Sequence, residues 1–397
     1  MNYTPNEFAT LAVHAAEAPD ALTGAVAPVL VRSKTFAQTF GVDQVFQYSR
    51  GKNPTRLQLE QKLALLDGGA YATTFASGVA ATAAFLFTLN PGDHVLCCQE
   101  VYGGTFRLLE QVFRKYGITA DYVDFSSEAS IKAGIKPNTK WLFVETPTNP
   151  SLHVIDLTLV SSVSKQQNIP FIVDATFSPP CSTLPLNHGA AVVLHSISKY
   201  IAGHNDVLGG VLITNDPLLH EQFAFQQKAS GAILSPDESY RVLQGVKTLH
   251  LRWERVSQSS LYIAKFLEQQ LGVGNVLYPG LETHPSHLIA AAQSKNGFGG
   301  VISFKVSDAS VPHLKAFVDS ITAAGTIIYG ESLASPETIL AYPPSMSHKS
   351  LPRDIRLSLG ITDGFFRLSI GFEAPDDIIK SLNNGFESLR KICTTKL

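Results

Sequence analysis

Residues 171–200 read FIVDATFSPPCSTLPLNHGAAVVLHSISKY, and this stretch indicates the fold class. It contains two short apolar runs, 171–173 and 191–194, and each run ends directly in polar residues. Continuous apolar runs of this length are typical of strands that are buried on both faces of a parallel sheet. In open α/β sheets, ligands bind beyond the carboxyl ends of the strands. Asp174 and the segment 195–199 are therefore predicted to lie beside a ligand.

The same pattern continues on both sides of this stretch. Further apolar runs occupy residues 94–98, 120–125, 141–145 and 210–214. Helical stretches such as 105–116 and 157–167 separate these runs. Strands that alternate with helices predict a largely parallel α/β sheet with helices on both faces.

Three regions follow from changes in the pattern along the chain. Residues 1–60 have little periodicity and are predicted to form an N-terminal arm that contacts a neighbouring subunit. Residues 61–245 form the ligand-binding α/β domain. A long helical pattern over 243–270 links it to a smaller α/β domain, residues 246–397, with expected strands at 300–306 and 366–370 and helices at 311–324 and 376–390.

Composition excludes several classes of protein. The chain of 397 residues is 45% hydrophobic and 16% charged, and its net charge is −2, so a large core is possible and no basic excess favours nucleic acid or a membrane surface. Residues 1–10 do not fit a signal peptide, and the apolar stretch 78–89 is too short to span a bilayer. We expect a soluble, cytoplasmic protein.

The four cysteines indicate neither a metal site nor a disulfide framework. Cys97, Cys98, Cys181 and Cys393 match no zinc-binding spacing, and paired extracellular cysteines are not suggested by their positions. We expect reduced thiols and no metal ion.

An aspartate and a lysine on neighbouring strand ends suit pyridoxal phosphate. The cofactor needs an amine for a Schiff base, which Lys199 can supply, and a carboxylate such as Asp174 to keep the pyridine nitrogen protonated. Ser196 and Ser198 flank the lysine and can donate hydrogen bonds to a phosphate. Taken singly, Asp174 fits a helix cap and Lys199 fits a solvated lysine. Their conjunction favours the cofactor.

Two further segments fit the same ligand. Gly78 and Val79 follow Ser77 at the start of a helical stretch, where main-chain amides can bind phosphate, although Ser-Gly before a helix is also an ordinary cap. Tyr102 follows the strand that ends at Cys98, and its ring can stack on a cofactor or pack in the core.

These segments belong to a wider resemblance. The specific motifs are Tyr48-Ser49-Arg50 with Asn53-Pro54-Thr55, the stretch Glu145 to Pro150 (ETPTNP), and Ser196-Ile197-Ser198-Lys199-Tyr200 with Gly203-His204. With them, the chain resembles the cysteine/methionine-metabolism family of pyridoxal-phosphate enzymes from Phe8 to Glu373. The family includes cystathionine γ-lyase, γ-synthase and β-lyase and methionine γ-lyase. It implies fold type I, an aminotransferase-like fold with a mostly parallel, seven-stranded type of sheet.

The resemblance also implies roles for single residues. Lys199 holds the cofactor and moves protons, and Tyr102 stacks on the ring and assists proton transfer. The remaining implied contacts are to the cofactor, from Asp174, Thr176, Gly78, Val79, Ser196 and Ser198, to the cofactor of a neighbouring subunit, from Tyr48 and Arg50, and to the substrate, from Asn149, Ser332, Glu331 and Arg367. The planar fork of Arg367 suits a carboxylate, although alone it also fits a salt bridge. A homotetramer built as a dimer of dimers is implied as well.

The chain departs from the family pattern near the cofactor ring and near the substrate entrance. Ala175 stands where the family usually has Asn, and the segments Gln47, Gly51-Lys52 and Ala334-Ser335-Pro336 differ from it near the entrance. Glu331 resembles the cystathionine γ-lyase and γ-synthase types, and Gly104 replaces a cysteine that is frequent in methionine γ-lyases. Both residues point away from a dedicated methionine lyase.

Three hypotheses remain at this point. The first is γ-elimination on cystathionine or a related sulfur amino acid, giving cysteine, 2-oxobutyrate and ammonia. The second is γ-replacement on an O-acyl homoserine, as in a cystathionine γ-synthase, with a possible place in specialised metabolism. The third is a scaffold protein that has lost catalysis, which the presence of Lys199, Asp174 and Arg367 disfavours.

Overall fold

The computed structural model describes residues 7–306, 310–349 and 352–394, and the chain divides into two compact units. Unit 1 takes its described residues from Met1–Gln99, Thr105–Glu145 and Asp156–His250. Unit 2 takes them from Glu100–Gly104, Thr146–Ile155 and Leu251–Leu397. Two short segments from the first half of the chain thus group with its C-terminal part.

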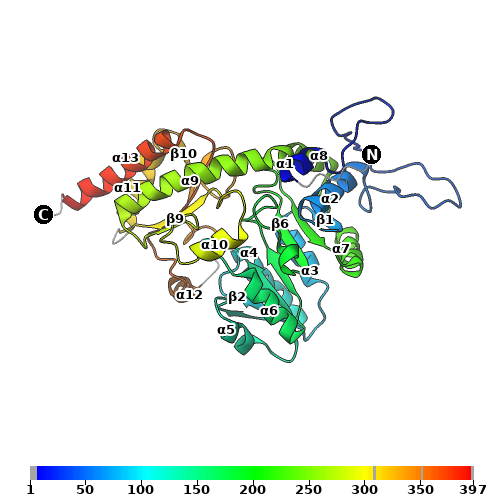
Figure 1. Ribbon diagram of the computed structural model, residues 1–397, viewed down its shortest axis with the longest axis horizontal. Coiled ribbons are helices and arrows are strands. Elements are labelled where there is room, and N and C mark those ends of the chain that lie inside the picture. The colour runs from blue at the N-terminus through cyan, green and yellow to red at the C-terminus, as the bar shows by residue number, and fades with distance from the viewer. Residues whose placement is uncertain (1–6, 307–309, 350–351, 395–397) are drawn as a thin grey trace. The chain divides into compact units, whose positions relative to one another are not determined.

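Unit 1 is built on a seven-stranded sheet with the order β1-β7-β6-β5-β4-β2-β3 (Figure 1). Strands β2 to β6 pair in parallel, whereas β7 runs antiparallel to both β1 and β6. This confirms the mostly parallel α/β sheet. The strands are β1 Tyr71–Phe75, β2 His94–Cys98, β3 Thr119–Val123, β4 Thr139–Glu145, β5 Phe171–Asp174, β6 Val192–Ser196 and β7 Gly210–Thr214.

One strand of this sheet is absent from the sequence-based prediction. Strand β1 carries two threonines and a tyrosine, so it lacks the continuous apolar run that marks its neighbours. Only its pairing with β7, from Tyr71 with Thr214 to Phe75 with Gly210, makes it a strand. Tertiary context decides such weakly patterned segments.

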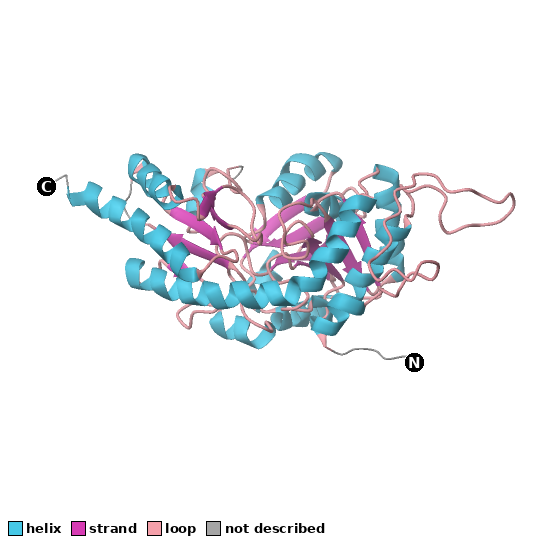
Figure 2. Ribbon diagram, turned by 90° about the horizontal axis from the view of Figure 1, so that it is seen from above, coloured by secondary structure: helices cyan, strands magenta, loops and turns pink. Residues whose placement is uncertain are grey.

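Helices lie on both sides of the strands of unit 1 (Figure 2). They are α1 Phe8–His14, α2 Pro54–Leu66, α3 Gly78–Leu86, α5 Glu128–Gly134, α6 Leu157–Gln167, α7 Pro217–Ser230 and α8 Pro236–Gly245, while α4 Gly103–Arg107 crosses the boundary between the units. The arm is therefore not wholly irregular. It contains α1 and the first turns of α2, which Asn53 caps by accepting from the amides of Thr55 and Arg56.

Two predicted helices are divided into shorter pieces. The helix expected at 105–116 is the end of α4, a π-helical turn over Leu108–Val112 and a 3₁₀ turn over Phe113–Tyr116. The helix expected at 243–270 is also divided, because a 3₁₀ turn over Val246–Thr248 separates α8 from α9 Leu249–Leu271. A β-carbon on Gly245 would come within 2.3 Å of the Ala202 carbonyl oxygen, so this junction requires glycine.

Unit 2 contains a five-stranded sheet with the order β10-β11-β12-β9-β8. Strand β10 is parallel to β11, and the other pairs are antiparallel. The strands are β8 Val276–Leu277, β9 Val301–Lys305, β10 Ile327–Tyr329, β11 Thr338–Ala341 and β12 Phe365–Ser369. The helices are α9, α10 His287–Gln293, α11 Val311–Thr322, α12 Arg353–Ser358 and α13 Pro375–Thr394.

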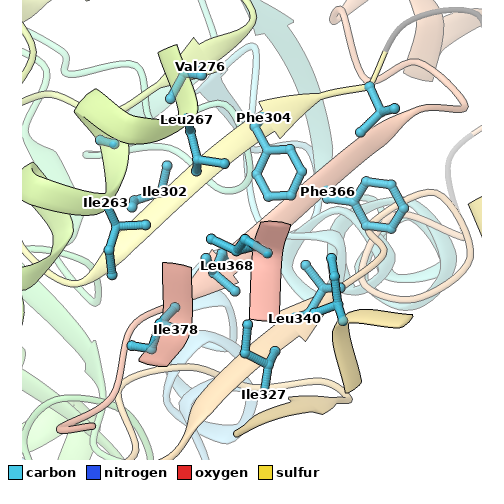
Figure 3. Packing of buried hydrophobic residues seen from close by; sticks show 14 of the residues in the cluster. Ile263, Leu267, Val276, Ile302, Phe304, Ile327, Leu340, Phe366, Leu368 and Ile378 are labelled. Atoms are coloured by element: carbon cyan, nitrogen blue, oxygen red, sulfur yellow. The ribbon is translucent and has the colours of Figure 1, made fainter. Parts of the chain in front are cut away.

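The core of unit 2 is an apolar cluster on one face of this sheet (Figure 3). Ile302 and Phe304 of β9 and Phe366 and Leu368 of β12 pack together, and the side chain of Ile263 comes to them from α9. The alternating inward positions 302, 304, 366 and 368 follow the two-residue period of a strand. The expected second α/β fold therefore has its own core.

The described residues include no helix with the length and apolar character that a membrane span requires. Within the same residues, no group of three or more His, Cys, Asp or Glu side chains is placed to hold a metal ion. Cys97, Cys98 and Cys181 are buried, and burial raises the pKa of the Cys97 thiol. The side chain of Cys393 lies outside the described residues.

The unit 2 core provides a test of stability. Leu368 is fully buried and pairs across the sheet with Ile302 and Leu340. We expect Leu368→Ala to lower the free energy of unfolding by about 2–5 kcal/mol, because a buried leucine leaves a cavity. The control is Leu251→Ala, since Leu251 on α9 is 57% exposed. Denaturant unfolding that gave equal losses for the two variants would contradict this packing.

Candidate active-site residues

Asp174 ends strand β5 as a buried carboxylate with one oxygen committed and one available. Its Oδ1 accepts hydrogen bonds from the amide and the hydroxyl of Thr176, at 3.0 and 2.6 Å. Among the described residues, Oδ2 accepts none. Burial raises the pKa of Asp174, and the Thr176 hydrogen bonds and the charge of His195 oppose that rise. A buried carboxylate oxygen of this kind is suited to accept a hydrogen bond from a ligand N–H.

The ends of β5 and β6 are held together through Thr176. The Ser196 amide donates to the Thr176 hydroxyl at 2.8 Å, and the Ala175 amide donates to the Leu194 carbonyl at 2.9 Å. The strands pair in parallel with Asp174 opposite Leu194. The two polar strand ends of the quoted stretch therefore meet at one edge of the sheet, as the sequence predicts.

Lys199 lies just beyond β6 in a turn that is held at both sides. Its amide donates to the Ser196 carbonyl at 3.2 Å, and its carbonyl accepts from the Gly203 amide at 2.8 Å. The Ser198 hydroxyl also fixes this turn, because it accepts from the Gly209 amide at 2.9 Å. The Lys199 side chain is half-buried. The main chain thus fixes the position from which the lysine extends.

The N-terminus of α3 approaches the same strand ends. Ser77 caps this helix by accepting from the Ala80 amide at 3.0 Å, which leaves the amides of Gly78 and Val79 at the open end. A β-carbon on Gly78 would come within 3.0 Å of the Ser196 β-carbon. Helix α3 therefore packs directly on Ser196. Main-chain amides and a hydroxyl are placed together as an anion site.

This set of groups fits pyridoxal phosphate. The Lys199 amine would bond to the aldehyde of the cofactor, and Oδ2 of Asp174 would accept a hydrogen bond from its pyridine N–H. The helix start beside Ser196 would bind its phosphate. Ser196 makes no side-chain hydrogen bond within the described chain, so its hydroxyl is available to a ligand oxygen.

Tyr48 and Arg50 lie in a different part of unit 1. They line a pocket of about 410 Å³ together with Gln47, Lys52 and Lys228. The Arg50 guanidinium lies 5.8 Å from the centre of the Tyr48 ring and donates to the Lys228 carbonyl at 2.8 Å. In the described part of the chain, neither residue hydrogen-bonds to the groups around Asp174 and Ser196. The structure places them on an exposed basic pocket.

In unit 2, the structure brings together three of the predicted substrate-binding residues. Arg367 on β12 is buried, and its Nη1 donates to the Asn149 side-chain oxygen at 2.8 Å while Nη2 donates to the Ser332 carbonyl at 2.9 Å. Ser332 has a positive φ of 93°, a conformation that costs about 1–3 kcal/mol for a non-glycine residue. These two hydrogen bonds hold the Arg367 guanidinium in a fixed orientation.

Two other residues with predicted roles, Glu331 and Tyr102, are exposed.

Two buried residues that contact Thr148 or Asn149 have no role predicted from the sequence. His348 is buried, hydrogen-bonds to the main chain of Asn149, and has its pKa lowered to about 4, first by burial and then by the charge of Arg367. Glu100 accepts from the Thr148 hydroxyl at 2.9 Å, and burial raises its pKa. Glu100 lies just beyond the carboxyl end of β2, where ligands bind in open α/β sheets, so its position in the sequence could have identified it. No sequence signal points to His348.

The whole chain is similar to known enzymes of sulfur amino-acid metabolism. The family model described as Cys/Met metabolism PLP-dependent enzyme matches residues 9–387. Cystathionine gamma-lyase of Bacillus subtilis (strain 168) is 39% identical over 96% of this chain and 99% of its own length. Cystathionine beta-lyase of Lactococcus lactis subsp. cremoris (strain MG1363) is 40% identical over 95% of this chain and 98% of its own length.

A solved structure extends this similarity to the fold. The structure of cystathionine gamma synthase from Xanthomonas oryzae pv. oryzae, in complex with aminoacrylate and cysteine, superposes with a TM-score of 0.93 at 36% identity. It covers 98% of this chain and 100% of that one. The fold class, the enzyme class and the cofactor predicted from the sequence are confirmed. The protein belongs to the Cys/Met-metabolism family of pyridoxal-phosphate-dependent enzymes.

Proposed function

We propose that the protein catalyses γ-elimination on cystathionine or a related sulfur amino acid, giving cysteine, 2-oxobutyrate and ammonia. The observation that carries this proposal is the position of Glu331. It directly precedes Ser332, whose carbonyl is bound by Arg367 at 2.9 Å. The family resemblance gives this exposed acidic side chain the role of facing the distal amino group of a substrate whose α-carboxylate binds Arg367. Cystathionine carries a second ammonium group, which a carboxylate can pair with.

The roles of the other residues follow from their chemistry. Pyridoxal phosphate, when bound, supplies an electron sink for the carbanion at the substrate α-carbon. In the proposed reaction, the Lys199 amine takes the α-proton as a general base and returns a proton later in turnover. Asp174 accepts the hydrogen bond of the pyridine N–H through Oδ2. Arg367 binds the α-carboxylate of the substrate through its planar fork.

A second candidate is γ-replacement on an O-acyl homoserine. Gln47 and Lys52, two of the positions that depart from the family pattern, line the basic pocket with Tyr48 and Arg50. The family resemblance places these positions near the substrate entrance, where a changed lining alters which acceptor or leaving group is favoured, so these residues support a different final step after the same proton transfers. A nucleophile such as cysteine would then take the place of the leaving group.

A product assay separates the two candidates. Purified protein with bound pyridoxal phosphate is incubated with cystathionine, and separately with an O-acyl homoserine plus cysteine. We expect cysteine, 2-oxobutyrate and ammonia from cystathionine. Cystathionine formed from the O-acyl homoserine, with little breakdown of cystathionine itself, would replace the lyase proposal by the synthase. Activity on neither substrate would overturn both.

Glu331 provides a test of the distal contact. We expect Glu331→Gln to raise the KM for cystathionine by roughly 3–10-fold, because an exposed ion pair contributes about 1 kcal/mol. The KM for a substrate without a distal ammonium, such as homocysteine, stays unchanged. Glu337→Gln is the matched control, since Glu337 is exposed on the same segment. Equal changes for both substrates would show that Glu331 does not meet the ammonium group.

We also propose that the protein assembles as a homotetramer, a dimer of dimers, in which Tyr48 and Arg50 reach the cofactor phosphate of a neighbouring subunit. The arm supports this, because Leu22, Val26 and Phe40 are almost wholly exposed in one chain. Exposed apolar side chains gathered on one segment are typical of an interaction surface. Sedimentation at several protein concentrations tests the proposal, and a stable monomer would contradict it.

A further inference from the structure

His195 is a buried histidine whose two ring nitrogens both face acceptors. Its Nε2 lies 3.1 Å from Asp67 Oδ2, and its Nδ1 lies 3.1 Å from the Ala175 carbonyl oxygen. His195 is 1% exposed and Asp67 is fully buried. A carbonyl only accepts, so Nδ1 must carry a hydrogen, and a carboxylate at Nε2 is satisfied when that nitrogen carries one too. The geometry therefore favours an imidazolium ion paired with Asp67.

This ion pair lies close enough to Asp174 for the charge of His195 to act on that carboxylate. His195 follows Leu194, which pairs with Asp174 in the sheet. The His195 ring hydrogen-bonds to the carbonyl of Ala175, the residue that follows Asp174. The ionisable side chains that act on His195 are Asp67 and Asp174. Burial lowers the pKa of His195, but the two carboxylates and the Ala175 carbonyl outweigh it, so that the pKa lies above its ordinary value.

We propose that the buried Asp67–His195 pair is a positioning device for Asp174, which keeps that carboxylate ionised and aimed at the pyridine nitrogen of the cofactor. Burial disfavours the charge on Asp174, and a fixed cation nearby offsets that cost. The hydrogen bond to Ala175 also fixes the main chain that leads from Asp174 to Thr176. This inference rests on the proposed contact between Asp174 and the pyridine nitrogen.

The test is cofactor affinity rather than turnover. Apoprotein is titrated with pyridoxal phosphate and, separately, with 1-deazapyridoxal phosphate, in which a carbon replaces the ring nitrogen. We expect His195→Gln to raise the Kd of pyridoxal phosphate by about tenfold, the effect of one lost charge interaction of ordinary strength. The Kd of the deaza analogue should stay within about twofold, because that analogue makes no contact with Asp174 through a ring nitrogen.

Two further variants make the result decisive. Asp67→Asn removes the partner charge and should raise the Kd of pyridoxal phosphate but not that of the deaza analogue, as His195→Gln does, which covers the case in which one variant does not fold. His94→Gln is the control, because His94 is a fully buried histidine of the same sheet that bonds to Thr139 and not to the residues around Asp174. It should leave the ratio of the two Kd values unchanged.

The outcomes separate this inference from the proposed role of Asp174. Equal weakening of both cofactors by His195→Gln and Asp67→Asn, or no weakening of either, would overturn the inference, since a purely structural role acts on both alike. Asp174→Asn is measured beside them. If Asp174→Asn weakens only pyridoxal phosphate while the other two variants do not, only the inference fails. If Asp174→Asn does not distinguish the cofactors, the proposed role of Asp174 fails as well.

Discussion

Lys199→Ala is expected to abolish turnover and to remove the visible absorbance that the covalently bound cofactor gives to the protein. The variant loses the amine that bonds to the cofactor and the base that moves protons. Loss of a positioned general base alone costs about 10²–10⁴-fold in rate. The absorption spectrum and the rate of 2-oxobutyrate release from cystathionine measure the two effects independently.

Controls for this variant come from the chain itself. Lys140 is an exposed lysine on β4, and Lys140→Ala should keep both the spectrum and the rate. Added methylamine should restore a small part of the rate to Lys199→Ala, since a free amine can take over proton transfer. A Lys199→Ala protein that retained both absorbance and turnover would show that another residue is the cofactor lysine.

Arg367→Lys is expected to lower kcat/KM by about 10²–10³-fold, mainly through a higher KM. Lysine keeps the charge but loses the planar fork, and hydrogen bonds to a charged group contribute about 1.5–3 kcal/mol each. Hydrogen bonds to Asn149 and Ser332 orient the guanidinium before the substrate binds. The single ammonium group of a lysine side chain cannot reproduce that orientation. Steady-state kinetics with cystathionine gives the separate changes in kcat and KM.

A buried arginine outside the proposed site serves as the matched control. Arg356 is 6% exposed and pairs with Asp363 at 2.5 Å. Arg356→Lys should lower the melting temperature without a selective rise in KM. If the two variants lose the same stability and the same activity, then Arg367 is a structural residue and the carboxylate contact is not supported.

The agreement between sequence and structure is closest where one local pattern carries the information. Strands β2 and β7 match the predicted runs residue for residue, and β5 extends the run 171–173 only by Asp174, because a strand that is buried on both faces must be continuously apolar. The meeting of the ends of β5 and β6, with Asp174 opposite Leu194, follows from the same pattern, since parallel neighbours end at one edge. The family motifs in the sequence also predicted the cofactor, and the comparisons with known proteins confirm that prediction.

The sequence was less informative where contacts decide the outcome. Strand β1 has no apolar run and exists through its pairing with β7. Arg367 meets Asn149 across 218 residues, and His195 meets Asp67 across 128 residues. No local period encodes such encounters, because they depend on how the sheets and helices pack.

The sequence by itself therefore determined the α/β class, through its apolar periodicity, and the cofactor, through its Asp174 and Lys199 pair and its family motifs. The roles of the single site residues stay predictions. Only the tertiary structure decided which acceptors surround His195, which groups orient the Arg367 fork and which oxygen of Asp174 is left available. Hydrogen-bond partners are set by side-chain geometry in a packed interior, where distant segments must satisfy one another's polar groups.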